Sequence, residues 1–548
     1  MNRQPTDITL PPDLTAHPVG TGPLRSHIPV YSNGMPPCNH SCPAGENIQS
    51  WLALAQAHHF EEAWLAIMDD NPLAAVSGRV CYHPCEKACN RNFTDTTVNI
   101  HAVERFLGDL ALQRNWRVTP GADTGKRVLI IGAGPCGLSA AYHLRRLGHF
   151  VEMREAGPVA GGMLHFGIPA YRLPRDILER EIARIIDLGV ICRCDHPVRD
   201  LARVQEEEAF DAVLVAVGAQ LSHKADIPAR EAGKILDALQ FLKSVDEGNP
   251  PRLGRRVAVY GGGNTAMDAA RTAQRLTGEE AMIIYRRDQK HMSAYDIEAA
   301  EALEEGVKIN WLRTIREIDG SNIIVEKMRM EKGEPVPTGQ FETLEADSLI
   351  LALGQDTDTT FLRNVQGLTF AADGTLIVGK DMSTGRPGIF AGGDVVPGER
   401  SVAIAIGHGK RAARHIDAWL KGSSYAKPPS PKTASFRHLH RWYRTDAPKR
   451  TQPEIAPDIR VKDFTEIRAG LMEAEAIFEA QRCLSCGNCT ECDGCFGACP
   501  ENAIVRLGKD KGYQIDLQRC TGCGVCVEQC PCDAMHLVPY AAAQNPGS

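Results

Sequence analysis

Nineteen cysteines form two tight groups along the chain, and this distribution suits metal ligation better than a disulfide framework. Five lie between residues 38 and 89, and eleven lie between residues 483 and 532. Only Cys136, Cys192 and Cys194 lie elsewhere. Closely spaced thiols in a large chain are typical of metal or iron–sulfur ligation. We therefore expect iron–sulfur clusters near both ends of the sequence.

Two runs near the end of the chain share the spacing C-x2-C-x2-C-x3-C-P. This is the spacing of bacterial two-cluster ferredoxins, in which the fourth cysteine of each run ligates the other [4Fe–4S] cluster. Zinc ribbons also use paired cysteines, but two complete runs that each end in Cys-Pro favour clusters. The predicted ligands are Cys489, Cys492, Cys495 and Cys530 for one cluster, and Cys520, Cys523, Cys526 and Cys499 for the other. Cys483, Cys486 and Cys532 are assigned no iron.

The first of two dinucleotide-binding motifs is KRVLIIGAGPCG at residues 126–137. Gly132 permits a tight turn, Gly134 lets the backbone approach a pyrophosphate, and Gly137 allows a helix to pack closely on a strand. The following helical pattern would present its N-terminus to the phosphates. A second strand ends at Glu155, where an acid can bind ribose hydroxyls. The alternative is a glycine turn with no ligand.

The second motif is RRVAVYGGGNTA at residues 255–266, with Gly261, Gly263 and Ala266 at the three small positions. The strand after it ends in Arg286 and Arg287 instead of an acid. Guanidinium groups bind a 2′-phosphate, which an acid would repel. The second site therefore favours NADP(H) over NAD(H), although two arginines at a strand end can also be solvated surface.

Five cysteines near the N-terminus lie at the starts of predicted helices. They are Cys38, Cys42, Cys81, Cys85 and Cys89. Helix N-termini favour anions, and a thiolate-bound iron–sulfur cluster carries net negative charge. We therefore predict a cluster here, with buried structural cysteines as the alternative.

The middle of the chain resembles flavoproteins of the pyridine-nucleotide–disulfide-oxidoreductase type, specifically the glutamate synthase small-subunit group. GAGPCGLSAA, GGMLHFGIPAYRLP, GGGNTAMDAA, YRRD and AGGD carry the resemblance, over roughly residues 36–420. The resemblance implies that FAD is bound by one set of residues, with Asp394 on the ribitol and Leu164, Gly167 and Arg172 along the flavin. The full set is Gly132, Gly134, Pro135, Gly137, Glu155, Gly162, Leu164, Gly167, Arg172, Gly393 and Asp394. The nicotinamide nucleotide would be held by Gly261, Gly263, Asn264, Thr265, Arg286 and Arg287.

The resemblance is incomplete at the N-terminal cysteines. The fuller family pattern has eight cysteines and two clusters, but this chain lacks the two expected before Cys38 and has Ser77 at another position. Five thiolates cannot fill two clusters of four, so we predict one N-terminal [4Fe–4S] cluster and three clusters in all. Its surest ligands are Cys42, Cys81 and Cys85. The fourth is Glu104, by resemblance to a family position, or else Cys38 or Cys89.

A chain of 548 residues is expected to form several domains. We predict a helical N-terminal iron–sulfur domain (1–120), a Rossmann-like FAD-binding domain (121–222 and 350–425) with a Rossmann-like NAD(P)-binding domain (223–349) inserted in it, a linker (426–480) and an α+β ferredoxin-like domain (481–548). The linker is rich in proline and basic residues, which suits a solvated connection or a surface for an acidic partner.

The formal charge of −7 gives no support for nucleic-acid binding. The sequence has no apolar run long enough for a membrane helix and no signal-peptide pattern at its start. We therefore expect a cytoplasmic protein without membrane insertion.

Together these features predict an NAD(P)H:acceptor oxidoreductase that passes electrons between NAD(P)(H), FAD and [4Fe–4S] clusters. The partner would be ferredoxin or another enzyme, and the chain would be the flavin subunit of a larger complex such as a 2-oxoacid:acceptor oxidoreductase. The alternative is a glutamate synthase small subunit that supplies electrons to a glutamate-forming large subunit. A redox-sensing scaffold without turnover is a third possibility, which the intact nucleotide motifs disfavour.

Overall fold

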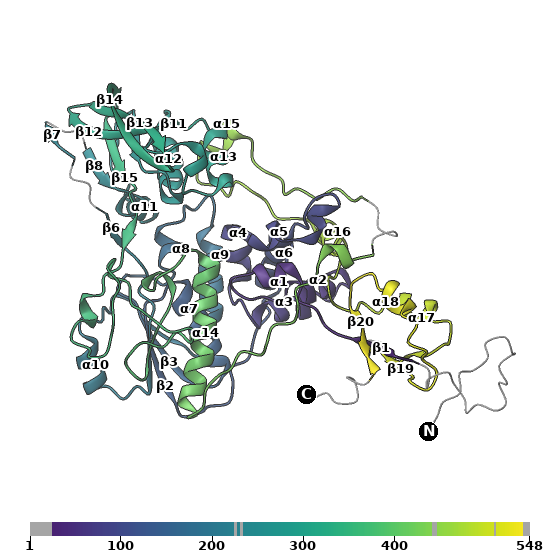
Figure 1. Ribbon diagram of the computed structural model, residues 1–548. Helices are drawn as coiled ribbons and strands as arrows, with labels where there is room; N and C mark the ends of the chain where they lie inside the picture. The colour runs from purple at the N-terminus through teal and green to yellow at the C-terminus, as the bar shows by residue number, and fades with distance from the viewer. Residues whose placement is uncertain (1–24, 224–226, 231–233, 441–445, 509–510, 541–548) are drawn as a thin grey trace, which may run out of the picture.

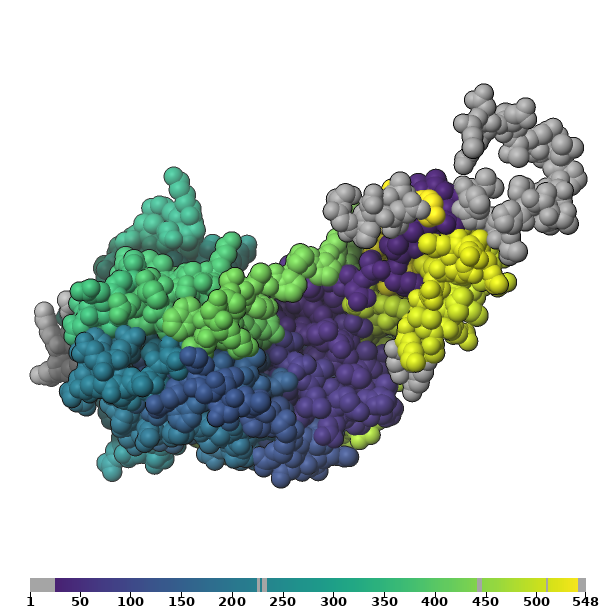
Figure 2. Space-filling view, turned by 90° about the horizontal axis from the view of Figure 1, so that it is seen from below, coloured from purple at the N-terminus to yellow at the C-terminus, as the bar shows by residue number. Residues whose placement is uncertain are grey.

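The computed structural model describes residues 25–223, 227–230, 234–440, 446–508 and 511–540. Two α/β lobes lie on one side of the molecule, purple N-terminal helices lie in the middle, and the yellow C-terminal domain lies on the other side (Figures 1 and 2). Within the described residues, no helix is both long and apolar enough to cross a membrane.

The first α/β lobe is built on a parallel sheet with the strand order β17-β5-β2-β3-β4. Its central strands are apolar and buried because helices cover the sheet. Helices α7 and α14 pack against each other along this lobe (Figure 1). The strands are β2 (Arg127–Ile131), β3 (Phe150–Arg154), β4 (Ile191–Arg193), β5 (Ala212–Val215) and β17 (Ile389–Ala391); the helices are α7 (Pro135–Arg146), α8 (Met163–Phe166), α9 (Arg175–Ile186), α10 (Leu201–Glu207) and α14 (Val402–Leu420).

The second lobe repeats this plan with the parallel order β11-β10-β9-β15-β8 and adds a sheet of order β14-β13-β12-β7. Its parallel strands are β8 (Lys234–Asp237), β9 (Val257–Tyr260), β10 (Ala281–Tyr285), β11 (Lys308–Trp311) and β15 (Ser348–Leu351). Its other elements are α11 (Ala238–Asp246), α12 (Asn264–Thr277), α13 (Asp296–Glu304), β7 (Ala229–Arg230), β12 (Arg313–Asp319), β13 (Asn322–Glu331) and β14 (Glu334–Glu345).

The chain passes between the two lobes through a two-stranded ribbon of β6 (Leu221–Ser222) and β16 (Gln355–Asp356). The second lobe is therefore an insertion in the sequence of the first. Strand β15 pairs with β9 of the second lobe through Leu351. The boundary predicted between residues 349 and 350 is wrong because it divides this strand.

The two motif turns have the same geometry. Gly132 has φ +103°, and a Cβ there would lie 2.4 Å from the carbonyl oxygen of Ala216, at the end of the neighbouring strand. Gly261 has φ +150°, and its Cβ would lie 2.1 Å from the carbonyl oxygen of Ala352. Both positions therefore require glycine, for backbone conformation and for space. Gly134 and Gly263 then cap helices α7 and α12.

Short helices form the N-terminal domain around two fully buried tryptophans, Trp51 and Trp64. They are α1 (Pro37–Ser41), α2 (Ile48–Gln56), α3 (Phe60–Met68), α4 (Ala74–Val80), α5 (Pro84–Lys87) and α6 (Ile100–Arg114). Strand β1 (His27–Tyr31) does not belong to them, because it pairs antiparallel with β20 (Met535–Pro539) at the other end of the chain. The predicted N-terminal domain of residues 1–120 therefore does not include residues 27–31, and its residues 1–24 lie outside the described residues.

The C-terminal domain is small and combines segments from both ends of the chain. Besides β1 and β20, it holds α17 (Gly494–Ala498), β18 (Ile504–Arg506), β19 (Tyr513–Ile515) and α18 (Val525–Glu528). Strands β18 and β19 form an antiparallel pair. Figure 1 shows β1 beside β20 in this domain.

The segment predicted as a solvated linker is held firmly to the rest of the protein along its second half. It contains α15 (Pro457–Arg460) and α16 (Glu473–Gln481) and crosses the surface as a light green strap (Figure 2). Arg460 is 2% exposed and forms ion pairs with Glu304 and Glu305 of the second lobe. Glu466 pairs with Arg79 in the N-terminal domain. These buried ion pairs contradict the prediction of a solvated linker here.

Candidate functional site

The first motif opens onto a cavity of about 530 Å³ in the first lobe. Its walls come from the turn after β2, the end of β3, the segment after β5 and the turn before α14. Seven of the predicted FAD-binding residues line it: Gly132, Gly134, Pro135, Glu155, Gly162, Gly393 and Asp394. Gly137 lies beneath the turn, where a Cβ would meet the carbonyl oxygen of Gly132 at 2.0 Å.

Two carboxylates shape this cavity. Glu155 accepts hydrogen bonds from the backbone N–H groups of Ala133, at 2.9 Å, and Gly157, at 2.8 Å, and so joins the turns after β2 and β3. Burial raises the pKa of Asp394 above its usual range, while Arg400 acts against this rise. A cavity of this volume, with bare glycine backbone and a carboxylate at each of two turns, suits a dinucleotide. The residues present therefore fit FAD.

Three residues predicted along the flavin do not line this cavity. Leu164 is fully buried, and Gly167 packs against Met163. Arg172 points to the second lobe, where it pairs with Glu298 and with both oxygens of Asp268, at 2.9 and 2.8 Å. Their roles beside the flavin stay predictions.

The second motif is partly exposed: Gly261 is buried, whereas Gly263, Asn264 and Thr265 are half-buried. Asn264 accepts a hydrogen bond from the backbone of Tyr295 at 3.0 Å, which fixes the start of α12. Thr265 accepts one from Gln355 at 3.4 Å. Arg286 is exposed, and Arg287 pairs at 3.2 Å with Glu334, whose side chain is 72% exposed. An exposed ion pair of this kind is weak, so Arg287 could release Glu334 for a phosphate.

Four of the predicted N-terminal ligands line a single small cavity. They are Cys42, Cys81, Cys85 and Glu104. Burial raises the pKa of the Cys81 thiol to about 12, and burial beside Glu46 raises the pKa of Glu104. Buried acids and thiols ionise readily only when a cation compensates them, so this set suits a metal cluster.

Cys38 and Cys89 line a different cavity, although each is only four residues from a member of the first set. Cys483 and Cys486, which were assigned no iron, line this second cavity with them. Nothing in the local sequence indicates that the two pairs meet, because roughly 400 residues separate them. The one indication in the sequence of a further ligand set is the C-x2-C spacing of Cys483 and Cys486, which belong to neither C-terminal run.

The C-terminal domain brings one of the two predicted ligand sets to a single cavity. Cys499, Cys520, Cys523 and Cys526 line one cavity, to which Pro29 of β1 also contributes. In the other predicted set, burial and the nearby thiols of Cys530 and Cys492 raise the pKa of Cys489. The hydroxyl of Tyr31 lies 3.1 Å from the sulfur of Cys495. Strand β1 thus lies against both predicted sites.

A cluster of His83, Glu86 and His101 lies near the N-terminal cysteines, with its ligand atoms within 4.8 Å of one another. His101 stacks on His83 and contacts Glu86 at 2.7 Å through one ring nitrogen and Gln452 at 2.9 Å through the other. Lys449 pairs with Glu86 at 2.8 Å. His101 and Lys449 already occupy Glu86, so the cluster is a hydrogen-bonded support for the cysteine loop, in which only Nε2 of His83 lies buried without a hydrogen-bond partner.

Helix α14 connects the FAD-binding cavity to the first cysteine cavity. Ala405 lines the former and Ala403 lines the latter. The backbone of Pro43, next to Cys42, comes so close to this helix that a Cβ on Gly407 would lie 2.1 Å from its carbonyl oxygen. The walls of the two cavities therefore include residues of the same turn of α14, only two positions apart.

Comparison with known families gives three matches along the chain. Residues 126–409 match the pyridine nucleotide-disulphide oxidoreductase family. Residues 31–116 match dihydropyrimidine dehydrogenase domain II, a 4Fe-4S cluster domain, and residues 488–534 match the 4Fe-4S dicluster domain. The chain is an oxidoreductase of a flavin-dependent type with iron–sulfur domains at both ends, as the sequence predicts.

Curated relatives match most of this chain. The NADP(+)-dependent formate dehydrogenase subunit beta of Moorella thermoacetica is 34% identical over 511 residues, covering 82% of this chain and 70% of the relative. The NADPH-Fe(3+) oxidoreductase subunit beta of Geobacter sulfurreducens is 33% identical, covering 82% and 75%. The glutamate synthase [NADPH] small chain of Azospirillum brasilense is 33% identical, covering 72% and 88%. With its nucleotide-binding lobes and its iron–sulfur domains, this chain belongs to the pyridine nucleotide-disulphide oxidoreductase family, among relatives similar to the glutamate synthase small subunit.

Proposed function

We propose that this chain transfers electrons between NADPH and a redox partner, through an FAD in the first lobe and [4Fe–4S] clusters in the N- and C-terminal domains. The observation that carries the proposal is the position of α14, which borders both the FAD-binding cavity and the first cysteine cavity. A bound flavin would exchange two electrons with the nicotinamide and single electrons with a cluster, which is the chemistry that this cofactor supplies.

The protein's own residues bind and position these groups. The N-terminus of α7, capped by Gly134, favours the phosphates of FAD, and the N-terminus of α12 does the same for the nicotinamide nucleotide. Cys42, Cys81 and Cys85 with Glu104 would hold the first cluster, because these four share one cavity while Cys38 and Cys89 do not. The two C-terminal sets would hold two more clusters.

The redox partner is proposed to be another subunit. Several relatives bear the names of subunits or small chains of larger enzymes. The C-terminal cluster domain follows the stretch, roughly residues 36–420, whose motifs resemble the glutamate synthase small-subunit group, and it lies at one end of the molecule (Figure 1). A partner that accepts electrons from this domain fits a ferredoxin or an oxidoreductase subunit. Purification of the native complex tests this, and co-purification of a glutamate-forming large subunit would favour the alternative.

NADPH is expected to bleach the bound flavin anaerobically, and Gly261→Ala is expected to shift this response to higher NADPH concentrations while retaining FAD. A Cβ at Gly261 would lie 2.1 Å from the carbonyl oxygen of Ala352, so the nucleotide turn must distort. Overpacking of this kind costs about 1–3 kcal/mol, which is about a ten- to hundredfold rise in KM for NADPH. Stopped-flow absorbance of the flavin measures the effect.

The control for this variant is Gly497→Ala, since a Cβ at Gly497 would meet nothing within 4 Å. It should bleach as the wild type does. If neither NADPH nor NADH bleaches the flavin of the wild-type protein, the proposed function is contradicted.

The double variant Arg286→Ala/Arg287→Ala is expected to raise KM for NADPH about ten- to hundredfold and to leave KM for NADH nearly unchanged. Charge-assisted hydrogen bonds to a phosphate contribute about 1.5–3 kcal/mol, and NADH lacks the 2′-phosphate. Arg255→Ala is the matched control, because the side chain of Arg255 is 82% exposed and pairs with Glu279. Arg255 precedes β9 and so lies at the opposite end of the parallel sheet from Arg286 and Arg287, which follow β10. Equal losses for both nucleotides would show that these arginines do not select NADPH.

A further inference from the structure

We propose that Cys38, Cys89, Cys483 and Cys486 bind an additional [4Fe–4S] cluster, with two ligands from each end of the chain. The four cysteines line one cavity between the N-terminal helices and the segment that follows α16. None of them lines the cavity of Cys42, Cys81 and Cys85 or that of the C-terminal domain. The match to the dicluster domain begins at residue 488, after both tail cysteines.

The surroundings of the cavity suit a cluster. Its other walls include the apolar side chains of Leu52, Val98 and Ile100, which exclude water. Asn90 donates a side-chain N–H to the sulfur of Cys486 at 3.4 Å, and the backbone N–H of Ser485 donates to Cys483 at 3.4 Å. Hydrogen bonds to ligating sulfurs and low solvent exposure are the means by which proteins tune such clusters.

The spacing of the cysteines explains how two neighbouring sites share one helical scaffold. Cys38 and Cys42 lie four residues apart at the two ends of α1, and Cys85 and Cys89 lie four residues apart around α5. Each pair supplies one thiol to each cavity. The N-terminal domain alone therefore offers only two thiols to the second cavity, and the C-x2-C pair of the tail completes the four that a cubane requires.

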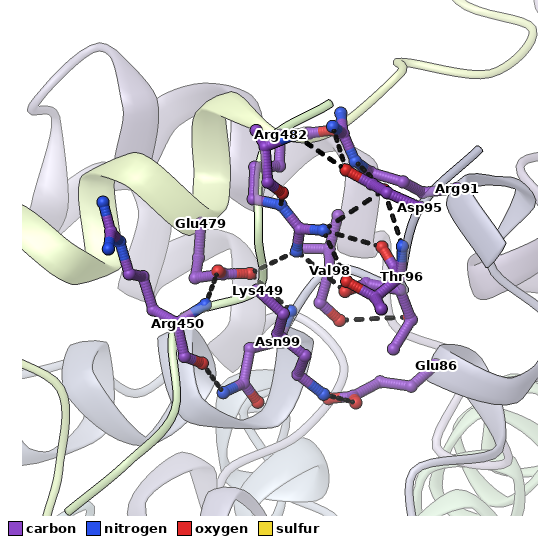
Figure 3. Close-up of polar contacts among 12 residues, drawn as sticks. Glu86, Arg91, Asp95, Thr96, Val98, Asn99, Lys449, Arg450, Glu479 and Arg482 are labelled. Atoms are coloured by element: carbon purple, nitrogen blue, oxygen red, sulfur yellow. Dashed lines mark hydrogen bonds and ion pairs between the residues drawn. The ribbon is translucent and has the colours of Figure 1, made fainter. Parts of the chain in front are cut away.

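A buried polar network fixes the tail pair against the N-terminal pair (Figure 3). Arg482, directly before Cys483, is 2% exposed and donates to the carbonyl oxygens of Thr96, at 2.7 Å, and Thr97, at 2.8 Å. Arg91, two residues after Cys89, donates to the carbonyl oxygen of Arg482 at 2.8 Å. Each arginine thus joins the segment that carries Cys89 to the segment that carries Cys483 and Cys486.

Glu479 and Arg450, both in the strap (residues 426–480), reinforce the same junction. Glu479, whose side chain is fully buried in α16, accepts from the backbone N–H of Asn99 at 2.8 Å and from Arg482 at 2.9 Å. Asn99 donates to the carbonyl oxygen of Arg450 at 2.8 Å, as Figure 3 shows. Buried charged groups are costly unless their partners are well placed. This network therefore fixes the position of the segment that carries Cys483 and Cys486 relative to the segment that carries Cys89.

Four cysteines can also bind zinc, but the place of this cavity favours a redox cluster. Cys486 precedes Cys489 of the C-terminal domain by three residues, so their α-carbons lie at most about 11 Å apart. On the other side, Cys38 and Cys89 adjoin the ligands of the first site. The cavity thus lies between the cluster site next to the flavin and the cluster sites of the C-terminal domain. A zinc ion at this position could not transfer electrons between them, because zinc has no redox chemistry.

The metal content of the full-length protein, isolated anaerobically and then reconstituted with iron and sulfide, tests the proposal. We expect about sixteen iron atoms and as many sulfides per chain, for four cubanes, and no zinc. The variant Cys483→Ser/Cys486→Ser should lose about four iron atoms. Cys38→Ser/Cys89→Ser should remove the same component from the Mössbauer and reduced-state EPR spectra. Cys532→Ser, a nearby buried cysteine outside all these cavities, is the control and should retain every component.

About twelve iron atoms in the reconstituted wild type would overturn the proposal, as would stoichiometric zinc. So would the loss of different spectral components in the two double variants. If a variant fails to fold, as a loss of FAD would reveal, the wild-type iron count and Mössbauer spectrum still decide. The proposal extends the proposed electron-transfer function, but these readouts are independent of it: NADPH need not reduce the flavin for the iron to be counted.

Discussion

Gly137→Ala is expected to weaken FAD binding and, with it, to lower NADPH-dependent activity. A Cβ at this position would lie 2.0 Å from the carbonyl oxygen of Gly132 and 3.3 Å from the side chain of Ile130. The first of these contacts is with backbone, so no side-chain rotation relieves it. Overpacking costs about 1–3 kcal/mol, and here the part that must move is the phosphate-binding turn itself. FAD affinity should therefore fall about ten- to hundredfold.

The ratio of flavin absorbance to protein after gel filtration measures this loss, and added FAD should restore part of it. Iron content should stay at the wild-type value, because Gly137 contacts none of the cysteine cavities. Gly497→Ala again provides the matched control. A variant that retains FAD at the wild-type ratio would show that the turn tolerates a Cβ, contrary to the geometry.

Much of the site was predictable where the ligands of one group lie close together in the sequence. The turn from Gly132 to Gly137 combines a strand, a helix and their glycine contacts within a dozen residues, so local spacing alone indicates its use. The same holds for the two C-terminal cysteine runs, whose members Cys499 and Cys520 to Cys526 line one cavity.

The sequence did not reveal the features that depend on contacts between distant segments. Cys483 and Cys486 have a ligand spacing but no local partners, and only the folded chain brings them to Cys38 and Cys89. The pairing of β1 with β20 likewise joins residues at opposite ends of the chain. Arg460 lies in a proline-rich stretch that is typical of a linker, yet it is buried in ion pairs. Composition describes the average exposure of a segment and cannot identify the one residue that is buried.

Glu305→Gln is expected to destabilise the second lobe by roughly 3 kcal/mol at neutral pH. The side chain of Glu305 is fully buried and accepts hydrogen bonds from Arg271, at 2.7 and 3.0 Å, and from Arg275, at 2.7 and 3.0 Å. Arg460 of the strap pairs with it at 3.0 Å. Glutamine keeps the shape but not the charge, so three buried guanidinium groups lose a shared counter-ion.

The size of this effect follows from the acidity of Glu305. Burial by itself would raise its pKa, but the hydrogen bonds from Arg271 and Arg275 outweigh burial and lower the pKa from 4.5 to about 2. A depression of this size corresponds to roughly 3 kcal/mol of stability when the group is ionised. The contribution is complete above the unfolded-state pKa of 4.5 and is lost as the pH falls from there toward about 2.

Hydrogen exchange of α12 and α13, followed by mass spectrometry, measures the local opening free energy without assuming two-state unfolding of a multidomain chain. The difference between wild type and Glu305→Gln should stay constant around neutral pH and shrink as the pH falls below about 4.5. Glu207→Gln is the matched control, because Glu207 is 57% exposed and its pair with Arg203 is a surface ion pair that contributes little to stability. Because Arg460 reaches Glu305 from the strap, exchange should also rise along α15 in the Glu305 variant. A pH-independent difference, or protection of α15 unchanged from wild type, would mean that Glu305 does not hold the strap to the second lobe through its charge.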